Sequence, residues 1–175
     1  MGKVIIFNAI RFFVVVLLQV ALFKNIGYYN LASVFPYIFF IFLLPIGLPN
    51  VVLFVTAFLT GLTVDAFYDS VGVHAAACVA LALFRTFFHK ITLEVEIKDS
   101  FNTPSLGEMG TKWFLPYVFF GTLIHHLTLF LVETFSFTNF LYTLASIILS
   151  SIFTVSVIFL MSLLVYKRKS RINSI

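Results

Sequence analysis

The chain has 175 residues, of which 61% are hydrophobic and only 10% are charged, and its mean hydropathy is +1.09. A soluble domain has about 25% charged residues, so a soluble fold is excluded and the surrounding medium is predicted to be lipid. The net charge of +4 does not indicate nucleic-acid binding, because the cations lie at the ends of apolar segments. The single cysteine, Cys78, excludes an internal disulfide and argues against a cysteine-based metal site.

The first predicted membrane span covers about residues 4–23 and is expected to be an uncleaved anchor helix, since no A-x-A cleavage site precedes Lys24. Arg11 lies about seven residues into this span, so its side chain is expected to snorkel to the membrane interface. The alternative is that Arg11, or the deeper Gln19, faces a neighbouring helix.

Residues 25–64 contain no charged side chain. A stretch of this length matches two spans of about 20 residues, which are expected over 29–45 and 49–67. The sequence LPIGLPN, residues 44–50, marks the break between them, because proline and glycine disfavour a continuous helix while proline is tolerated in a first turn.

The later part of the chain alternates apolar and polar segments. Within the polar part, Thr92–Lys98 alternates apolar and charged side chains, which predicts a strand or an extended segment along the membrane interface. The sequence predicts spans over about 71–88, 113–132 and 140–166, a cytoplasmic loop over 89–112 and a basic C-terminal tail over 167–175.

Six spans place both termini on the same side of the membrane. That side then holds ten of the eleven Lys and Arg residues, and the opposite side holds only Lys24. Because positive charge is enriched on the cytoplasmic side, both termini are predicted to be cytoplasmic. The predicted fold class is therefore all-α: a polytopic membrane protein in which residues 1–175 form a single membrane domain, a compact bundle of six transmembrane helices.

Ionisable residues interrupt the apolar spans near the predicted outer face. A charged side chain costs about 2.5–3.5 kcal/mol at the bilayer centre on insertion scales, so these residues are expected to serve packing or function. We expect them to form an interhelical polar cluster of Asp65, Asp69, His74, His126 and Glu133. A metal site built from four of them, without Asp69, is the less favoured alternative.

Motifs of intramembrane hydrolysis do not occur in the sequence. It contains neither H-E-x-x-H, which holds zinc beside a general base, nor the G-x-S-x-G nucleophile elbow. The adjacent His125 and His126 point about 100° apart on a helix and are not expected to chelate one ion. We therefore predict a protein that is not an enzyme, with no cofactor and no bound metal.

Small residues recur every four positions in three predicted spans, a spacing that allows membrane helices to approach closely. The row Gly72, Ala76, Ala80 is a candidate for helix packing or for contact with a partner. The other two rows are Ala57, Gly61, Asp65 and Ser146, Ser150, Thr154.

Several stretches, in this order, resemble the MreD family of rod shape-determining integral membrane proteins. They are Arg11 with Leu17–Gln19, the segment Gly61–Phe67, the segment Asp69–Ala77, and His125–Phe137. None of these motifs is specific alone; their order, the chain length and the six-span pattern establish the resemblance, which covers most of the chain.

The resemblance implies a non-enzymatic scaffold of the cell-wall elongation machinery in the bacterial inner (cytoplasmic) membrane, supporting peptidoglycan synthesis and rod cell shape. The implied partner is an MreC-like bitopic membrane protein. Through it, the implied indirect partners are an MreB-like filament, a RodA-like glycosyltransferase and a class B penicillin-binding transpeptidase. The family's fold is similar to the substrate-binding subunits of energy-coupling-factor transporters, so the alternative function is a substrate-binding membrane subunit of a small-molecule transporter.

Overall fold

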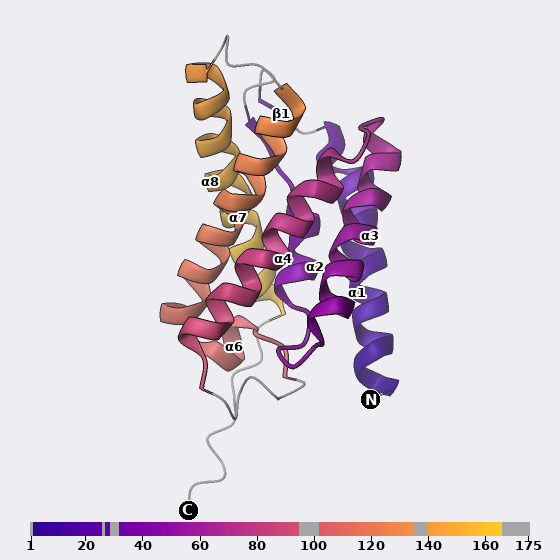
Figure 1. Cartoon of the computed structure of the whole chain (residues 1–175), viewed down its shortest axis with the longest axis vertical. Coiled ribbons are helices and arrows are strands. Elements are labelled where there is room, and N and C mark those ends of the chain that lie inside the picture. The colour runs from indigo at the N-terminus through magenta and orange to yellow at the C-terminus, as the bar shows by residue number, and fades with distance from the viewer. Residues whose placement is uncertain (1, 26, 29–31, 95–101, 135–139, 166–175) are drawn as a thin grey trace, which may run out of the picture.

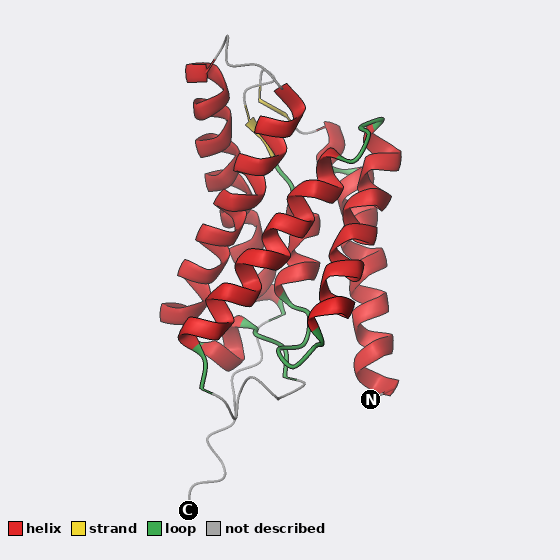
Figure 2. Cartoon of the chain, viewed as in Figure 1, coloured by secondary structure: helices red, strands yellow, loops and turns green. Residues whose placement is uncertain are grey.

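The computed structural model describes residues 2–25, 27–28, 32–94, 102–134 and 140–165. The architecture is helical, with long helices that run lengthwise and loops gathered mainly at the two ends (Figures 1 and 2). The long helices are α1 (Gly2–Ala21), α3 (Asn50–Tyr68), α4 (Val73–Thr92), α7 (Thr111–Thr134) and α8 (Phe140–Leu164). The short elements are η1 (Phe23–Asn25), β1 (Gly27–Tyr28), β2 (Ala32–Ser33), η2 (Pro36–Ile38), α2 (Phe39–Phe42) and α6 (Leu106–Met109).

Five helices within the described residues are long and apolar enough to cross a membrane. Large apolar side chains such as Phe13, Val51 and Leu160 point outward from them and are largely exposed. An apolar outer surface of this kind suits contact with lipid. The chain is thus a helical membrane protein. We call the end of the bundle where α1 begins and α8 ends the proximal end, and the opposite end the distal end (Figure 1).

The expectation of a helical span over 29–45 is wrong for the described part of that range. Residues 32–46, which we call the central segment, contain β2, the 3₁₀ turn η2 and the four-residue α2 rather than one long helix. Pro36 lies inside the expected span, and proline removes a helix hydrogen bond and clashes with the preceding turn. The central segment leads from the distal end, where β2 pairs with β1, toward the proximal end, where Ile46 N donates to Asn102 O (Figure 1).

Every residue from Val34 to Ile46 is buried. A non-helical backbone at membrane depth is tolerated only where protein covers it and satisfies its polar groups. Side chains of the surrounding helices do so at the segment's start: Ser150 Oγ accepts from Ser33 N at 2.9 Å, and Thr154 Oγ1 accepts from Phe35 N at 3.1 Å. Gln19, from α1, donates to Val34 O at 3.2 Å and accepts from Tyr37 N at 3.4 Å.

The second half of the central segment is held by donors to its carbonyl oxygens. Arg85, on α4, donates to Ile41 O at 2.7 Å, Leu44 O at 2.5 Å and Pro45 O at 2.8 Å. Tyr117 donates to Phe42 O at 3.2 Å, and Arg11 donates to Leu43 O at 2.9 Å. Arg11 therefore contacts the interior of the bundle, which is the alternative that the sequence left open for it, and is half-buried.

Helices α3 and α4 approach closely at Gly61. A Cβ added there would lie 2.4 Å from Ala75 Cα and 2.5 Å from His74 O. No side chain fits that space, so this row of small residues serves the contact between α3 and α4. The row Ser146, Ser150, Thr154 is also buried and includes two of the side chains that hold the central segment.

The polar region after α4 differs in detail from the expected loop over 89–112. Helix α4 continues to Thr92, the short α6 follows, and α7 already begins at Thr111. The alternating Thr92–Lys98 falls mostly outside the described residues. Trp113, at the start of α7, donates to Thr92 Oγ1 at 3.0 Å and so ties the two helix ends together.

Candidate functional site

Asp65, on the last turn of α3, is buried and faces the first turn of α4. Its Oδ1 accepts from His74 N at 2.9 Å and from Ser70 Oγ at 2.6 Å, and its Oδ2 accepts from Ala75 N at 3.0 Å. The cap position of α4 is Gly72, which has no side chain to accept these bonds. Asp65 thus performs from α3 the capping task that a residue of α4 usually performs, and its negative charge suits a helix N-terminus.

Asp69 has a different role from Asp65. It ends α3 in the left-handed conformation, with φ 55° and ψ 29°, and its side chain is exposed. It is the only described residue other than glycine with a positive φ. Aspartate tolerates this conformation better than most residues. Asp69 therefore belongs to the turn between the helices, and the structure does not place its carboxylate in the buried cluster.

Tyr37 lies at the centre of the buried polar groups. Its hydroxyl is 3.0 Å from His74 Nδ1 and 2.8 Å from His125 Nε2, and Cys78 Sγ lies 3.7 Å away. A phenol has one proton to donate and two lone pairs. If Tyr37 donates to one imidazole, the other imidazole must donate to Tyr37. Because His74 approaches through Nδ1 and His125 through Nε2, the two histidines then hold the same tautomer, with the proton on Nε2 of both or on Nδ1 of both. Two helices, α4 and α7, and the central segment meet at this oxygen.

His126 points to a different set of partners. Its Nδ1 lies 2.8 Å from Thr122 O, and its Nε2 lies 3.3 Å from Thr154 Oγ1. Thr154 in turn accepts from the central segment at Phe35 N. Of the adjacent histidines, His125 thus contacts Tyr37 and His126 contacts α8, as their angular separation on the helix requires.

Glu133 lies near the distal end of α7 and is exposed, away from the buried hydrogen bonds of Asp65. It lines a pocket of about 510 Å³ whose other lining residues include His74, Phe35 and Tyr68. Ser146, which is buried and also lines this pocket, has no hydrogen-bond partner for its hydroxyl within the described residues. We call this the distal pocket; both Glu133 and His74 line it.

The predicted cluster is therefore brought together only in part. Asp65 accepts from His74 N, whereas His126 bonds Thr122 and Thr154 instead. Glu133 shares only the distal pocket with His74, and Asp69 is exposed. Among the residues that the structure describes, no group of three His, Cys, Asp or Glu side chains is placed to hold a metal ion.

Sequence reasoning did not single out Tyr37, and it treated Arg85 only as a topology signal, although both are buried at the centre of the bundle. Arg85 is 2% exposed, and Tyr37 is fully buried. The available signal was Pro36: a proline within an apolar run indicates a broken backbone, and a broken backbone at membrane depth requires side-chain donors.

Comparisons with protein-family models, with curated proteins and with solved structures give no match for this chain.

Proposed function

We propose that this chain is a non-enzymatic membrane scaffold of the cell-wall elongation machinery, which supports peptidoglycan synthesis and rod cell shape together with an MreC-like bitopic protein. The proposal starts from the resemblance to the MreD family in Gly61–Phe67, Asp69–Ala77 and the other stretches named above. It places the chain in the bacterial inner membrane, in indirect contact with the MreB-like filament and the peptidoglycan synthases.

One observation supports a scaffold most directly: the polar residues of the resembling stretches hold the protein's own backbone or one another. Arg11 and Gln19 bind the central segment, Asp65 caps α4, and His125 bonds Tyr37. Polar groups engaged in this way fix the relative positions of helices. Such a role suits a protein whose function is to present a defined surface to other membrane proteins.

The proposal includes a topology of six crossings. Five are the long helices, and the sixth is the central segment, which is shielded from lipid by the helices around it. This count keeps both termini on one side, and the distribution of Lys and Arg assigns that side to the cytoplasm.

We propose that the row Gly72, Ala76, Ala80 on α4 forms part of the contact with the MreC-like partner. All three residues are half-buried, while the neighbouring Ala75 and Ala77 face the core. A Cβ added at Gly72 would meet no atom within 4 Å. The row thus offers a surface on which the helix of a partner can approach closely.

The test is co-purification of the MreC-like protein with the full chain from membranes. The double variant Ala76→Leu, Ala80→Leu adds bulk to the row and is expected to reduce the recovered partner at least about tenfold, while protein level and monodispersity are retained. Ala66→Leu, which adds the same bulk to an exposed position of α3, is the matched control. Failure of the unaltered chain to recover the partner would contradict the proposed function, whereas full recovery by the double variant would contradict only the docking row.

A specific observation favours the alternative function, a substrate-binding subunit of a small-molecule transporter. The distal pocket, of about 510 Å³, falls within the usual range of ligand sites, about 300–1,000 Å³, and combines aromatic rings with hydroxyls and one carboxylate. Recovery of an ATPase-containing partner complex in place of the MreC-like protein would favour the transporter subunit over the scaffold.

A further inference from the structure

The distal pocket, of about 510 Å³, lies at the end of the bundle where α3 and α7 end and α4 and α8 begin (Figure 1). Its lining comes from the start of the central segment, the junction between α3 and α4, the last turns of α7 and the first turns of α8. Most of the lining residues are polar, although the surrounding helices are largely apolar. Whether a ligand can bind depends on which of these polar groups the protein itself leaves without a hydrogen bond.

Two hydroxyl groups on the first turns of α8 line the distal pocket without a hydrogen bond. Thr143 and Ser146 are 6% and 2% exposed, and neither hydroxyl has a partner within the described residues. Several other hydroxyls on the long helices donate to the carbonyl oxygen four residues earlier; these are Thr60, Thr63, Thr86, Thr128, Ser156 and Ser162. Such a bond satisfies a hydroxyl inside a helix. Without it, Thr143 and Ser146 are available to a molecule in the pocket.

Glu133 and His74 add two more unpartnered groups to the lining. Glu133, on the last turn of α7, makes no hydrogen bond or ion pair within the described part of the chain. The Nδ1 of His74 lies 3.0 Å from the Tyr37 hydroxyl, whereas its Nε2 has no partner among the described residues. When Nδ1 donates to Tyr37, Nε2 is an acceptor. The two hydroxyls, the carboxylate and this nitrogen can therefore all accept hydrogen bonds from a ligand.

The charge around the distal pocket is negative. None of the described residues that line it is a lysine or an arginine, and Glu133 supplies a carboxylate. The carboxylate of Asp65 lies next to the lining, because Ser70, which lines the pocket, donates to its Oδ1 at 2.6 Å. The neighbouring Lys24 contacts the Tyr68 ring, but its ammonium donates to the backbone of α3 and does not line the pocket. This distribution of charge favours a cation over an anion.

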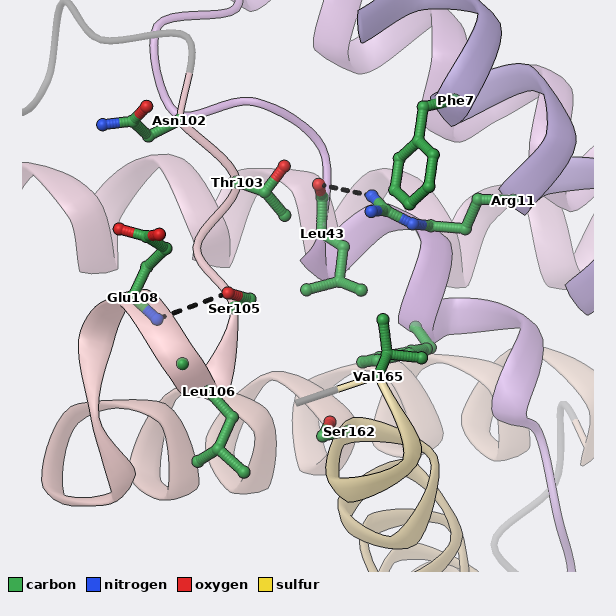
Figure 3. A pocket seen from close by; sticks show the side chains of 12 residues that line it. Phe7, Arg11, Leu43, Asn102, Thr103, Ser105, Leu106, Glu108, Ser162 and Val165 are labelled. Carbon is green, nitrogen blue, oxygen red and sulfur yellow. Dashed lines mark hydrogen bonds between the residues drawn. The ribbon is translucent and has the colours of Figure 1, made fainter. Parts of the chain in front are cut away.

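The pocket at the proximal end, of about 400 Å³, lacks these properties. There, Arg11 donates to Asn8 Oδ1 at 3.0 Å and to Leu43 O at 2.9 Å, and Glu108 has an interaction of its own. Figure 3 shows the chain at residues 103–105 between Arg11 and Glu108. The charged groups of the proximal pocket are thus engaged with the protein, and the distal pocket is the better ligand site.

We propose that the distal pocket binds a small organic cation that carries a protonated amine on an apolar or aromatic body. The ammonium lies against Glu133 and donates to the hydroxyls of Thr143 and Ser146, while the body packs on the rings of Phe35 and Phe130, which also line the pocket. The site names a ligand class for the pocket that favours the transporter alternative. It requires neither the MreC-like partner nor an ATPase, so it can be tested on the full chain alone.

Equilibrium dialysis of the full chain in detergent micelles at neutral pH tests the proposal with three probes of similar shape. Phenethylamine has an ammonium, phenethyl alcohol a hydroxyl and hydrocinnamate a carboxylate at the end of the same phenyl body, and empty micelles give the background. The unaltered chain is expected to bind phenethylamine at least about tenfold more tightly than the other two probes, because hydrogen bonds to ionised groups are the stronger ones.

Glu133→Gln removes the charge and keeps the shape, so it is expected to weaken binding of phenethylamine at least about tenfold while phenethyl alcohol binds as before. Thr143→Val removes a hydroxyl that has no partner within the described residues. It should weaken binding of phenethylamine about two- to tenfold without loss of folded protein.

Asp69→Asn is the matched control. It removes an exposed carboxylate at the same end of the bundle that does not line the pocket, and asparagine also tolerates the left-handed conformation of this position. The control should bind all three probes as the unaltered chain does.

Absence of saturable phenethylamine binding above empty micelles would overturn the proposal, as would equal or tighter binding of either other probe by the unaltered chain. Unchanged binding of phenethylamine by Glu133→Gln would also overturn it. So would an equal loss in Asp69→Asn, because cations would then be attracted to the distal end in general. None of these results bears on recovery of the MreC-like partner, which tests the scaffold function separately.

Discussion

Arg85 shows how a single buried cation can replace the hydrogen bonds that a helix would provide. Its guanidinium donates to three carbonyl oxygens over Ile41–Pro45, a stretch that leaves helical geometry after Phe42. A guanidinium has five donors in a fixed plane, whereas a lysine ammonium is a single point of charge. Arginine is therefore the side chain best suited to bind several carbonyl groups at once.

We predict that Arg85→Met lowers the free energy of unfolding by about 3 kcal/mol, because it leaves several buried carbonyl oxygens without a donor. Retention of monodisperse protein in detergent during a thermal ramp measures the effect. Lys90→Met, which removes an exposed charge from the same helix, is the control and should lie within about 0.5 kcal/mol of the unaltered chain. An Arg85→Met variant as stable as this control would show that Arg85 does not hold the central segment.

At the level of elements, the pair α3 and α4 depends on the absence of a side chain at Gly61. We predict that Gly61→Ala costs about 1–3 kcal/mol, the usual cost of overpacking, because the new methyl group would meet the backbone of Ala75 rather than a flexible side chain. Thermal unfolding checks this, with Leu62→Ala, at an exposed position of α3, as the control. A Gly61→Ala variant of unchanged stability would mean that the two helices separate at no cost.

The sequence predicts the long helices well because each has an apolar stretch of membrane length bounded by polar or turn residues. It fails at the central segment, because hydropathy does not distinguish an irregular backbone covered by protein from a helix covered by lipid. Pro36 alone marked the difference. The candidate site follows the same pattern: Asp65 and His74 are evident from their charge, but the backbone amides that Asp65 binds have no signature in the sequence.

At the level of the whole molecule, the proposed topology has six crossings with cytoplasmic termini. Reporter fusions placed after Asp69, in the turn at the distal end, and after Lys169, in the basic tail, should read periplasm and cytoplasm respectively. The reason is that the charge asymmetry favours this orientation. Two fusions that report the same side, or the reverse pattern, would be incompatible with six crossings in this orientation.

The central claim is that the buried polar residues serve to hold the bundle together, so that the protein acts as a scaffold rather than through a titratable group. Asp65→Asn tests it most directly. An amide keeps one acceptor oxygen, which can still cap α4, but presents a donor where Ala75 N now donates; a loss of about 1–3 kcal/mol is therefore expected. Asp65→Leu, which removes every acceptor, is expected to lose more and to lower the protein level.

The decisive measurement is restoration of rod shape by Asp65→Asn in a strain that lacks this protein, scored together with the amount of folded protein in the membrane. If the protein acts as a scaffold, rod shape should be restored in proportion to the amount of folded Asp65→Asn protein in the membrane. An Asp65→Asn variant that is folded and abundant but does not restore rod growth would contradict it, because the ionisable carboxylate itself would then be required.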